Sequence, residues 1–432
     1  MTSPLFGIVA DDLTGAMDSA GAMATHGLSA EVLLKGDLDL SRTTPDVVCI
    51  NTHSRLMSER QAVRAVTGAT RRLLSLGCAR LYKKIDSTLR GHIGAELTAT
   101  LQAAGTARAF VCPAFPDMGR TTRGGLLHVE GQALTVTREG NDPFSAVGEA
   151  SVVRLLQQQT GYNIGLVPLE DVEQGGDAVV DRAETLLAGG CNLVVMDATS
   201  REHMITLASA LGNSYSKDLV AGSAGMAAAL AKVRKKETAD TGRQAMTRPA
   251  GSFVIISGSL HPASYEQVQQ FSRSSSVKLV PVSAEAVLQS PHRVALTTVR
   301  DAADAVAGGH DVALFWQDPE SLQALLRNAS LLPQLVQAIA GFFGSVLAGL
   351  ILQQDLAGLV VVGGETAQMV VKAVGATSIE LLGEVRPGIP TGRLVGGLAD
   401  CKLLVTKAGA FGGPSALAEV IEYLRSVPQS EA

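Results

Sequence analysis

Short apolar runs alternate with longer amphipathic stretches along most of the chain. In the first half, apolar runs predict strands at residues 6–10, 31–34, 47–51, 80–85, 109–113, 163–167 and 193–196. Stretches such as 58–76 and 93–104 between them carry apolar residues at helical spacing. Strands that are apolar on both faces and separated by helices predict a mostly parallel sheet covered by helices on both sides.

A second α/β series follows a charged and polar stretch around residues 232–249. It predicts strands at 253–256, 278–280, 294–297, 312–315, 359–362, 379–382 and 403–405. We therefore expect an α/β protein of two domains with mostly parallel sheets flanked by helices. The expected bounds are 1–235 for the first domain, 236–250 for a linker and 251–432 for the second.

Composition narrows the class of protein. The 432 residues are 46% hydrophobic and 18% charged, so the chain can bury sizeable cores. A net charge of −5 and only 4% aromatic residues argue against a nucleic-acid partner or an anionic membrane surface.

Several features favour a cytoplasmic protein without a membrane segment. The five cysteines are odd in number and form no C-x-x-C, which is typical of reduced buried thiols. Asp11 and Asp12 stand too early for a secretory signal. The most apolar stretch, 338–352, is shorter than the ~20 residues that span a bilayer.

Polar residues follow two of the predicted strands in the first half. The strand 6–10 runs into Asp11 and Asp12, and a helix begins near Thr14. Ligands of open α/β sheets bind outside the carboxyl ends of the strands, although Asp12 could equally be a helix cap. The strand 80–85 carries Lys83 and Lys84 and leads into Asp86.

Adjacent lysines on a strand point to opposite faces, and a lysine on a covered face is costly unless it is paired. At least one of Lys83 and Lys84 should therefore meet Asp86, Asp12 or an anionic ligand, and a purely structural Lys–Asp pair stays open. Arg55, after the strand 47–51, can bind a carboxylate with two hydrogen bonds, although a lone loop arginine is more often solvated.

Two kinds of loop complete the set of candidates. The segment 112–125 carries Asp117, Arg120 and Arg123, either as a wall of an anion pocket or as an ordinary connection. Three turns (255–264, 360–368 and 405–417) each join a strand to a helix through small residues. Such turns let backbone N–H groups and a helix N-terminus face a phosphate. No P-loop, dinucleotide fingerprint, protein-kinase motif or zinc spacing is present.

Five motifs in order resemble the four-carbon acid sugar kinase family, whose members phosphorylate threonate, erythronate or 3-oxo-tetronates. They cover nearly the whole chain: ADDLTGA (10–16), KKIDSTLRG (83–91), CPAFP (112–116), VVGGETA (361–367) and AGAFGGP (408–414). The resemblance implies an N-terminal sugar-acid-binding domain, a C-terminal ATP-binding domain and an active site in the cleft between them.

The resemblance also assigns residues. It implies substrate contacts from the first domain, namely Asp11, Asp12, Arg55, Lys83, Lys84, Ile85 and Asp86. It implies ATP contacts from the second domain, namely Ser257, Ser259, Gly363, Gly364, Glu365, Thr366 and Gly409.

Residue chemistry and resemblance together predict a transfer of phosphate from ATP, with Mg²⁺, to the terminal hydroxyl of D-threonate, giving 4-phospho-D-threonate. Asp86 or Asp12 would accept the hydroxyl proton, and Lys84 would neutralise charge. D-erythronate or a 3-oxo-tetronate stays open as the substrate. An NAD-dependent sugar-acid dehydrogenase and a non-catalytic sensor are less favoured alternatives, and a homodimer is left open.

Overall fold

The computed structural model describes residues 3–34, 44–141, 147–234, 249–273, 276–328 and 330–426. The chain divides into two compact units, residues 1–33 with 37–243 and residues 34–36 with 244–432. The predicted linker, 236–250, lies outside the described residues except for Pro249 and Ala250.

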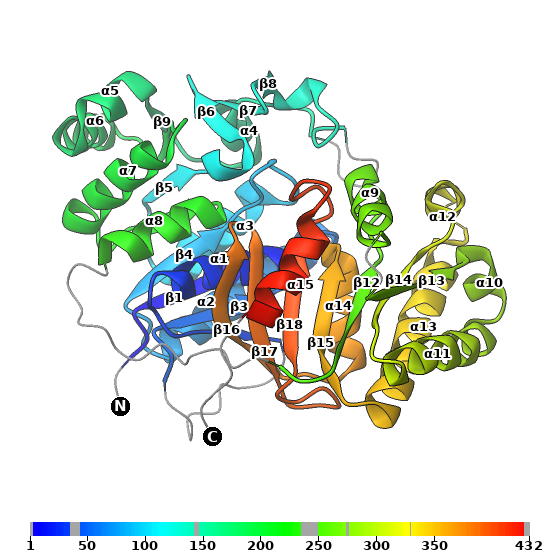
Figure 1. The fold of residues 1–432 in the computed structure, drawn as a ribbon. Helices are drawn as coiled ribbons and strands as arrows, with labels where there is room; N and C mark the ends of the chain where they lie inside the picture. Colours follow the sequence, from blue (N-terminus) through cyan, green and yellow to red (C-terminus); the bar gives the residue numbers. More distant parts are fainter. Residues whose placement is uncertain are drawn as a thin grey trace. The chain divides into compact units, whose positions relative to one another are not determined.

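The first unit is built on a parallel sheet with the strand order β2-β3-β1-β4-β11-β5-β10-β9 (Figure 1). The strands are β1 (Phe6–Ala10), β2 (Ala30–Leu33), β3 (Val47–Asn51), β4 (Arg80–Lys84), β5 (Ala109–Cys112), β9 (Ile164–Val167), β10 (Leu193–Met196) and β11 (Leu219–Gly222). The predicted parallel sheet is confirmed, and β11 is a strand that the sequence pattern missed.

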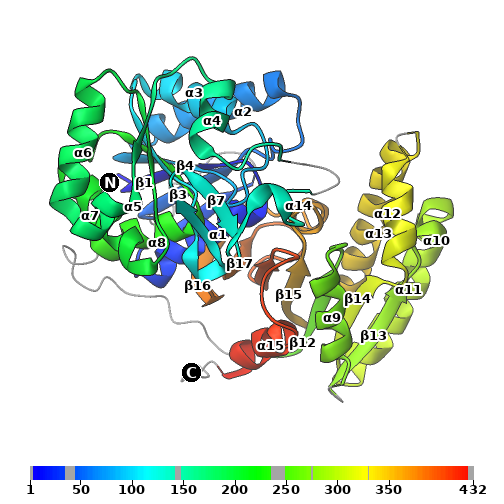
Figure 2. The ribbon, with the colours of Figure 1, turned by 90° about the horizontal axis from the view of Figure 1, so that it is seen from above.

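Helices cover both faces of this sheet (Figure 2). The helices α1 (Leu13–Thr25), α7 (Arg201–Ser214) and α8 (Ala224–Arg234) pack on one face. The opposite face carries α2 (Glu59–Ser75) and α3 (Ile93–Ala104), which pack on each other. The remaining helices are α4 (Val152–Gln159), α5 (Leu169–Gln174) and α6 (Gly176–Ala188).

The segment after β5 forms a small antiparallel sheet rather than a plain loop. It contains the 3-10 turns η1 (Pro116–Met118) and η2 (Leu134–Val136) and the strands β6 (Arg120–Arg123), β7 (Leu126–Val129) and β8 (Gln132–Ala133). Asp117 pairs with the exposed Arg201 at 2.8 Å. Arg120 is buried and lies 3.6 Å from Glu139. It also interacts electrostatically with Asp86.

The second unit has the strand order β13-β14-β12-β15-β18-β17-β16. The strands are β12 (Ser252–Ser257), β13 (Val277–Val282), β14 (Asp311–Trp316), β15 (Leu356–Val362), β16 (Ser378–Arg386), β17 (Ile389–Val395) and β18 (Leu403–Lys407). The first five in this order are parallel, and β17 and β16 add an antiparallel hairpin.

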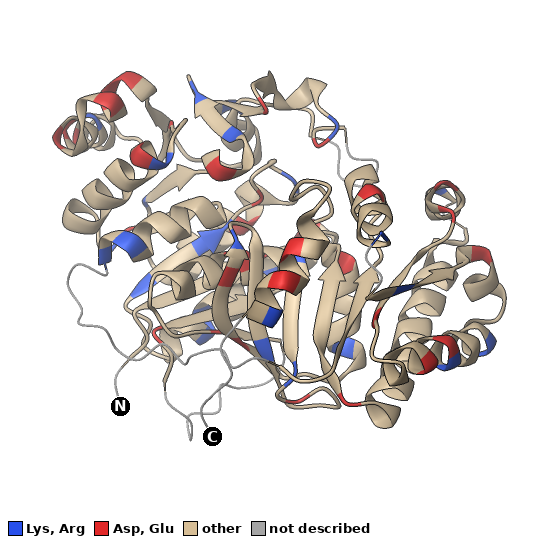
Figure 3. Ribbon diagram, viewed as in Figure 1, with Lys and Arg blue, Asp and Glu red and all other residues tan. Residues whose placement is uncertain are grey.

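Helices again lie on both faces of the sheet (Figure 2). One face carries α9 (Pro262–Phe271) and α15 (Ala416–Ser426). The other carries α10 (Ala284–Gln289), α11 (Pro291–Ala307), α12 (Pro319–Arg327), α13 (Leu332–Gln353) and α14 (Gly364–Ala373). In both units most charged residues lie on helices and loops, and few lie on the strands (Figure 3).

One predicted strand of the second unit is wrong. Residues 294–297 lie inside α11, a helix of 17 residues. Its buried residues recur every three or four positions, at Ala295, Thr298, Val299, Ala302, Ala303 and Val306. The short run 294–297 by itself fits a strand and a buried helix turn equally well. The helical spacing of the buried residues over the longer segment favours the helix.

Helix α13 is longer than its apolar stretch suggested. It spans 22 residues, and among the described helices it is the one long and apolar enough to cross a membrane by length and composition. Its buried residues, including Leu335, Phe342 and Leu350, pack in the second unit against α11 and α14. A single helix of this kind, packed in this way, is weak evidence for a membrane span.

Candidate functional site

Three neighbouring strands of the first unit end at the same edge of the sheet. The parallel register pairs Ala10 of β1 with Asn51 of β3, and Val9 of β1 with Lys83 of β4. The segments that follow these strands therefore lie side by side. They carry the aspartate–arginine cluster, which consists of Asp11, Asp12, Arg55 and Asp86.

Arg55 is the centre of this cluster. Its Nε and Nη2 donate to the two carboxylate oxygens of Asp11 at 2.7 and 2.9 Å. Its Nη1 and Nη2 donate to Asp12 at 2.8 and 3.0 Å, and Nη2 lies 3.5 Å from Asp86. The Arg55 side chain is only 12% exposed. Most of its donor capacity is thus used inside the protein rather than left for a ligand.

Asp12 caps a helix and also belongs to the cluster. Its Oδ1 accepts from the N–H of Gly15 at 2.9 Å and so caps α1. Its Oδ2 accepts from Arg55, its one protein donor among the described residues. A carboxylate oxygen can accept more than one hydrogen bond, so Oδ2 retains capacity for a ligand hydroxyl.

Asp86 is held as an ion by several donors. Arg90 donates from Nε and Nη2 at 2.7 and 3.0 Å, and the Thr88 hydroxyl also donates to it. Burial alone would raise the pKa of Asp86, but Arg90 and Arg55 outweigh burial and hold this pKa well below its ordinary value. Asp11 is similar: Arg55, Lys83 and Lys84 outweigh burial and lower its pKa.

Lys83 has a partner that the sequence analysis missed. Its Nζ lies 2.8 Å from Oε2 of Glu96 and donates to the carbonyl of Lys84 at 2.8 Å. Glu96 also accepts from the Ser54 hydroxyl at 2.6 Å, next to Arg55. Both charged side chains are almost fully buried, at 1% and 3% exposed. Glu96 therefore ties the ends of β3 and β4 to α3.

Lys84 is the contrasting neighbour. It is 5% exposed, and its Nζ makes no hydrogen bond or ion pair with any part of the chain that the structure describes. A Cβ added at Gly15 would come within 2.8 Å of this Nζ, so the ammonium lies against the start of α1. The Ile85 side chain belongs to the hydrophobic core, and its N–H donates to Gly222.

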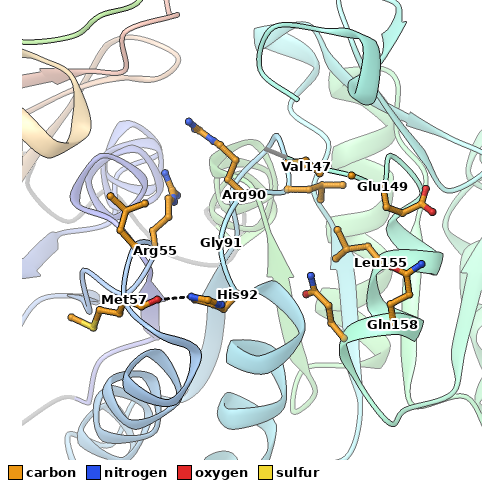
Figure 4. Close-up of a pocket in the computed structure, with 13 residues that line it drawn as sticks. Arg55, Met57, Arg90, Gly91, His92, Val147, Glu149, Leu155 and Gln158 are labelled. Carbon is orange, nitrogen blue, oxygen red and sulfur yellow. Dashed lines mark hydrogen bonds between the residues drawn. The ribbon is translucent and has the colours of Figure 1, made fainter. Parts of the chain in front are cut away.

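A cavity of about 530 Å³ opens beside the cluster. Arg55 and Arg90 line one side of it, and Glu149, Leu155 and Gln158 lie across from them (Figure 4). On the floor, His92 Nε2 and the Met57 carbonyl are joined by a hydrogen bond of 2.7 Å. The cavity is roomy enough for a small polar ligand next to the cluster.

The three glycine-bearing turns of the second unit also converge. The register pairs Ser257 of β12 with Val362 of β15, and Val362 with Lys407 of β18. A Cβ added at Gly363 would lie 3.4 Å from the Ser259 Cβ, and one at Gly409 would lie 3.0 Å from it. The turns carry all the residues predicted for ATP: Ser257, Ser259, Gly363, Gly364, Glu365, Thr366 and Gly409.

The chemistry of these turns fits a phosphate group. Gly363 has φ of 110°, a conformation that favours glycine, and α14 starts behind it without a side-chain cap. The start of a helix presents N–H groups without intrahelical partners, which suits an acceptor such as a phosphate oxygen. Among the described residues, no group of three or more His, Cys, Asp or Glu side chains is arranged to hold a metal ion.

The fold and these two regions define a class of protein with one sugar-binding and one nucleotide-binding domain. Residues 6–230 match the family model of a sugar-binding N-terminal domain. Residues 254–417 match that of a nucleotide-binding C-terminal domain.

Relatives make the class specific. A D-threonate kinase of Bordetella bronchiseptica is 34% identical over 98% of this chain and 98% of its own length. A 3-oxo-tetronate kinase of Pseudomonas fluorescens is 30% identical over 95% of both chains. A solved protein of Salmonella typhimurium has a TM-score of 0.82 at 23% identity, covers 96% of this chain and 98% of its own, and supports the fold alone. The chain belongs to the four-carbon acid sugar kinase family.

The Glu96–Lys83 pair gives a first prediction. Glu96→Gln leaves the buried Lys83 ammonium without its counter-ion, so we expect a loss of about 2–5 kcal/mol in the free energy of unfolding. Urea denaturation measures it. Glu184→Gln, at an exposed position on α6, is the control and should change this free energy by less than about 0.5 kcal/mol. Equal stability of the two variants would show that the pair contributes nothing.

The lowered pKa of Asp86 gives a second prediction. Its folded pKa lies well below the ordinary 3.8, so its contribution to stability is present above about pH 4 and is lost as the pH falls through the folded pKa. The Asp86→Asn variant lacks this contribution, and its stability should fall less steeply with acid than that of the wild type.

Urea denaturation between pH 2.5 and 7, a range chosen around the ordinary carboxyl pKa, tests this. Asp181→Asn, at an exposed position on α6, is the control and should keep the wild-type slope. Parallel pH profiles for wild type and Asp86→Asn would contradict the prediction.

Proposed function

We propose that this protein transfers the γ-phosphate of ATP to the terminal hydroxyl of a four-carbon sugar acid, with D-threonate as the substrate. The observation that carries the proposal is the uncommitted Lys84 ammonium beside the carboxylates of Asp11, Asp12 and Asp86, in a chain of this kinase family. An acidic cluster with one available cation suits a substrate that bears both hydroxyls and a carboxylate.

The sugar acid would bind at the aspartate–arginine cluster, with the adjoining cavity as its entrance. Hydroxyl groups of the substrate can donate to Asp12 Oδ2, which has a single protein donor among the described residues. Arg55 acts chiefly by holding Asp11 and Asp12 as ions in fixed positions. Lys83 supports the same segment through Glu96, and Ile85 contributes backbone only.

Two aspartates are candidates for the group that receives the hydroxyl proton. Asp86 is surrounded by donors and has a strongly lowered pKa, so it is a weak base and suits an orienting role. Asp12 accepts fewer hydrogen bonds in total, and its Oδ2 accepts from Arg55 alone among the described residues. Lys84 would neutralise negative charge that develops near the start of α1, a contribution that phosphoryl transfer depends on.

ATP would bind at the turns of the second unit. The N–H groups at the start of α14 and the close approach allowed by Gly409 suit phosphate oxygens. Mg²⁺ bound to the phosphates would neutralise their charge, as in other phosphoryl transfers. We further propose domains at 1–235 and 251–432 joined by a linker at 236–250, and a cytoplasmic enzyme with sugar acid and ATP as its small-molecule partners.

A substrate screen tests the proposal. Purified protein with ATP and Mg²⁺ is offered D- and L-threonate, D- and L-erythronate and their 3-oxo forms, and ADP release is measured. We expect the highest kcat/KM with D-threonate and a product phosphorylated at the terminal carbon. A preference for D-erythronate or a 3-oxo-tetronate would replace the substrate but keep the reaction. No ADP release with any acid would refute the kinase proposal.

The role of Lys84 gives a further prediction. Lys84→Met keeps the length of the side chain and removes its charge, and we expect kcat to fall about 10²–10³-fold, as for a lost electrostatic contact to the transition state. Steady-state kinetics with the preferred acid measure the effect. Lys217→Met, at an exposed position after α7, is the matched control. A kcat within about twofold of the wild type would exclude Lys84 from the chemistry.

A further inference from the structure

Lys407, the last residue of β18, is a buried cation that the proposed reaction leaves without a role. It is 1% exposed. Its Nζ donates to the carbonyls of Ala408 and Phe411 at 3.0 and 2.8 Å and lies 3.5 Å from that of Gly409. These carbonyls all belong to the turn that follows the strand.

A second side chain binds the same turn. Gln267 of α9 donates from Nε2 to the carbonyls of Phe411, Gly412 and Gly413 at 3.1, 2.9 and 3.0 Å. Gln267 is also buried, at 1% exposed. Lys407 and Gln267, both buried, therefore donate hydrogen bonds to most of the carbonyl groups of residues 408–413.

Within the turn, the N–H of Phe411 donates to the carbonyl of Ala408 at 3.1 Å, and four other N–H groups differ from it. In the described part of the chain, those of Gly409, Ala410, Gly412 and Gly413 make no hydrogen bond. A turn in which buried donors bind most carbonyls, while these four N–H groups make no hydrogen bond, has the polarity that an anion needs. Gly409 is also one of the proposed contacts to ATP.

Lys407 forms no ion pair with any described residue. The elements packed around β18 and its turn carry several charged or titratable side chains. They are His261 at the N-cap of α9, Tyr265 and Glu266 on α9, Glu365 and Lys372 on α14, Arg393 on β17, and Glu419, Glu422, Tyr423 and Arg425 on α15. None of them shifts the pKa of Lys407, which burial alone lowers to about 7. A bound polyphosphate would therefore be its first counter-charge.

We infer that Lys407 is a positioning residue for the nucleotide, which shapes the turn 408–413 from beneath and adds the positive charge that phosphate groups need there. The inference rests on the proposed function, because it assumes that this turn meets ATP. It assigns Lys407 no contact with the sugar acid and no part in proton transfer.

Nucleotide binding at this turn should depend on pH. An anion over the turn stabilises the charged form of Lys407, so binding raises its pKa and takes up a proton. With a free-state pKa of about 7, nucleotide affinity should be highest at pH 6 and should fall as the pH rises above 7. A methionine in this position has no proton to gain.

Calorimetric titration with ATP and Mg²⁺ at pH 6, 7 and 8.5, in buffers of different ionisation enthalpy, tests this in the whole protein. Between pH 6 and 8.5 we expect the wild-type affinity to fall about tenfold more than that of Lys407→Met, with proton uptake missing in the variant. ATP's own titration is common to both proteins and cancels in the comparison. Lys402→Met, which loses the exposed pair with Asp355 in the same unit, should behave as wild type.

Gln267→Met separates shape from charge. It should weaken ATP binding at every pH but keep the wild-type pH dependence, and it allows the test even if Lys407→Met does not fold.

Identical pH profiles for wild type and Lys407→Met would overturn the inference while ATP binding itself stands. If Lys407→Met is unfolded, wild-type and Gln267→Met binding without proton uptake beyond that of ATP would overturn it. Absence of ATP binding by the wild type would overturn both the inference and the proposed function.

Discussion

The pairing of Arg55 with three aspartates is the interaction on which the first unit depends. Buried carboxylates are costly unless a cation and hydrogen bonds compensate them, and one guanidinium here serves the segments after β1, β3 and β4. Because the strands are parallel, these segments meet at one edge, and Arg55 fixes their relative positions. The order of the cluster thus follows from the direction of the strands and from charge neutrality together.

The second unit solves a different electrostatic problem with different groups. It matches a nucleotide-binding family model, and in the proposed function its turns would bind the phosphates largely with backbone groups. The turns after β12, β15 and β18 lie side by side, and buried donors hold the carbonyls of the last one. Small residues allow the turns to touch, since a side chain at Gly409 would collide with Ser259. Charged side chains thus form the cluster of the first unit, whereas the turns of the second unit consist mostly of small residues held from beneath by Lys407 and Gln267.

Much of this arrangement could be predicted from the sequence, and the reasons for the rest are physical. A strand followed by acids or small residues is visible locally, so Asp11, Asp86 and the three turns could be placed at strand ends. The partner of Lys83 could not be predicted in this way, because Glu96 lies on α3 and only the packing of that helix brings the two residues together. The sequence pattern also could not show that the guanidinium of Arg55 donates its hydrogen bonds to Asp11 and Asp12. In the second unit, the run 294–297 was too short to separate a strand from a turn of α11.

The two adjacent lysines of β4 show how one local rule produces both stability and chemistry. Alternation along the strand places the Lys83 and Lys84 side chains on opposite faces of the sheet. The groups on each face then determine whether the ammonium is paired. Lys83 meets Glu96 under α3 and becomes part of the framework. Lys84 meets the start of α1, where Asp12 is already held by Arg55 and by the helix cap. Its charge is therefore not consumed by the carboxylates beside it, because Arg55 and Arg90 have already paired with them. The arginines keep a lysine available to a ligand, and this is the clearest physical link between the folded cluster and the phosphoryl transfer proposed for it.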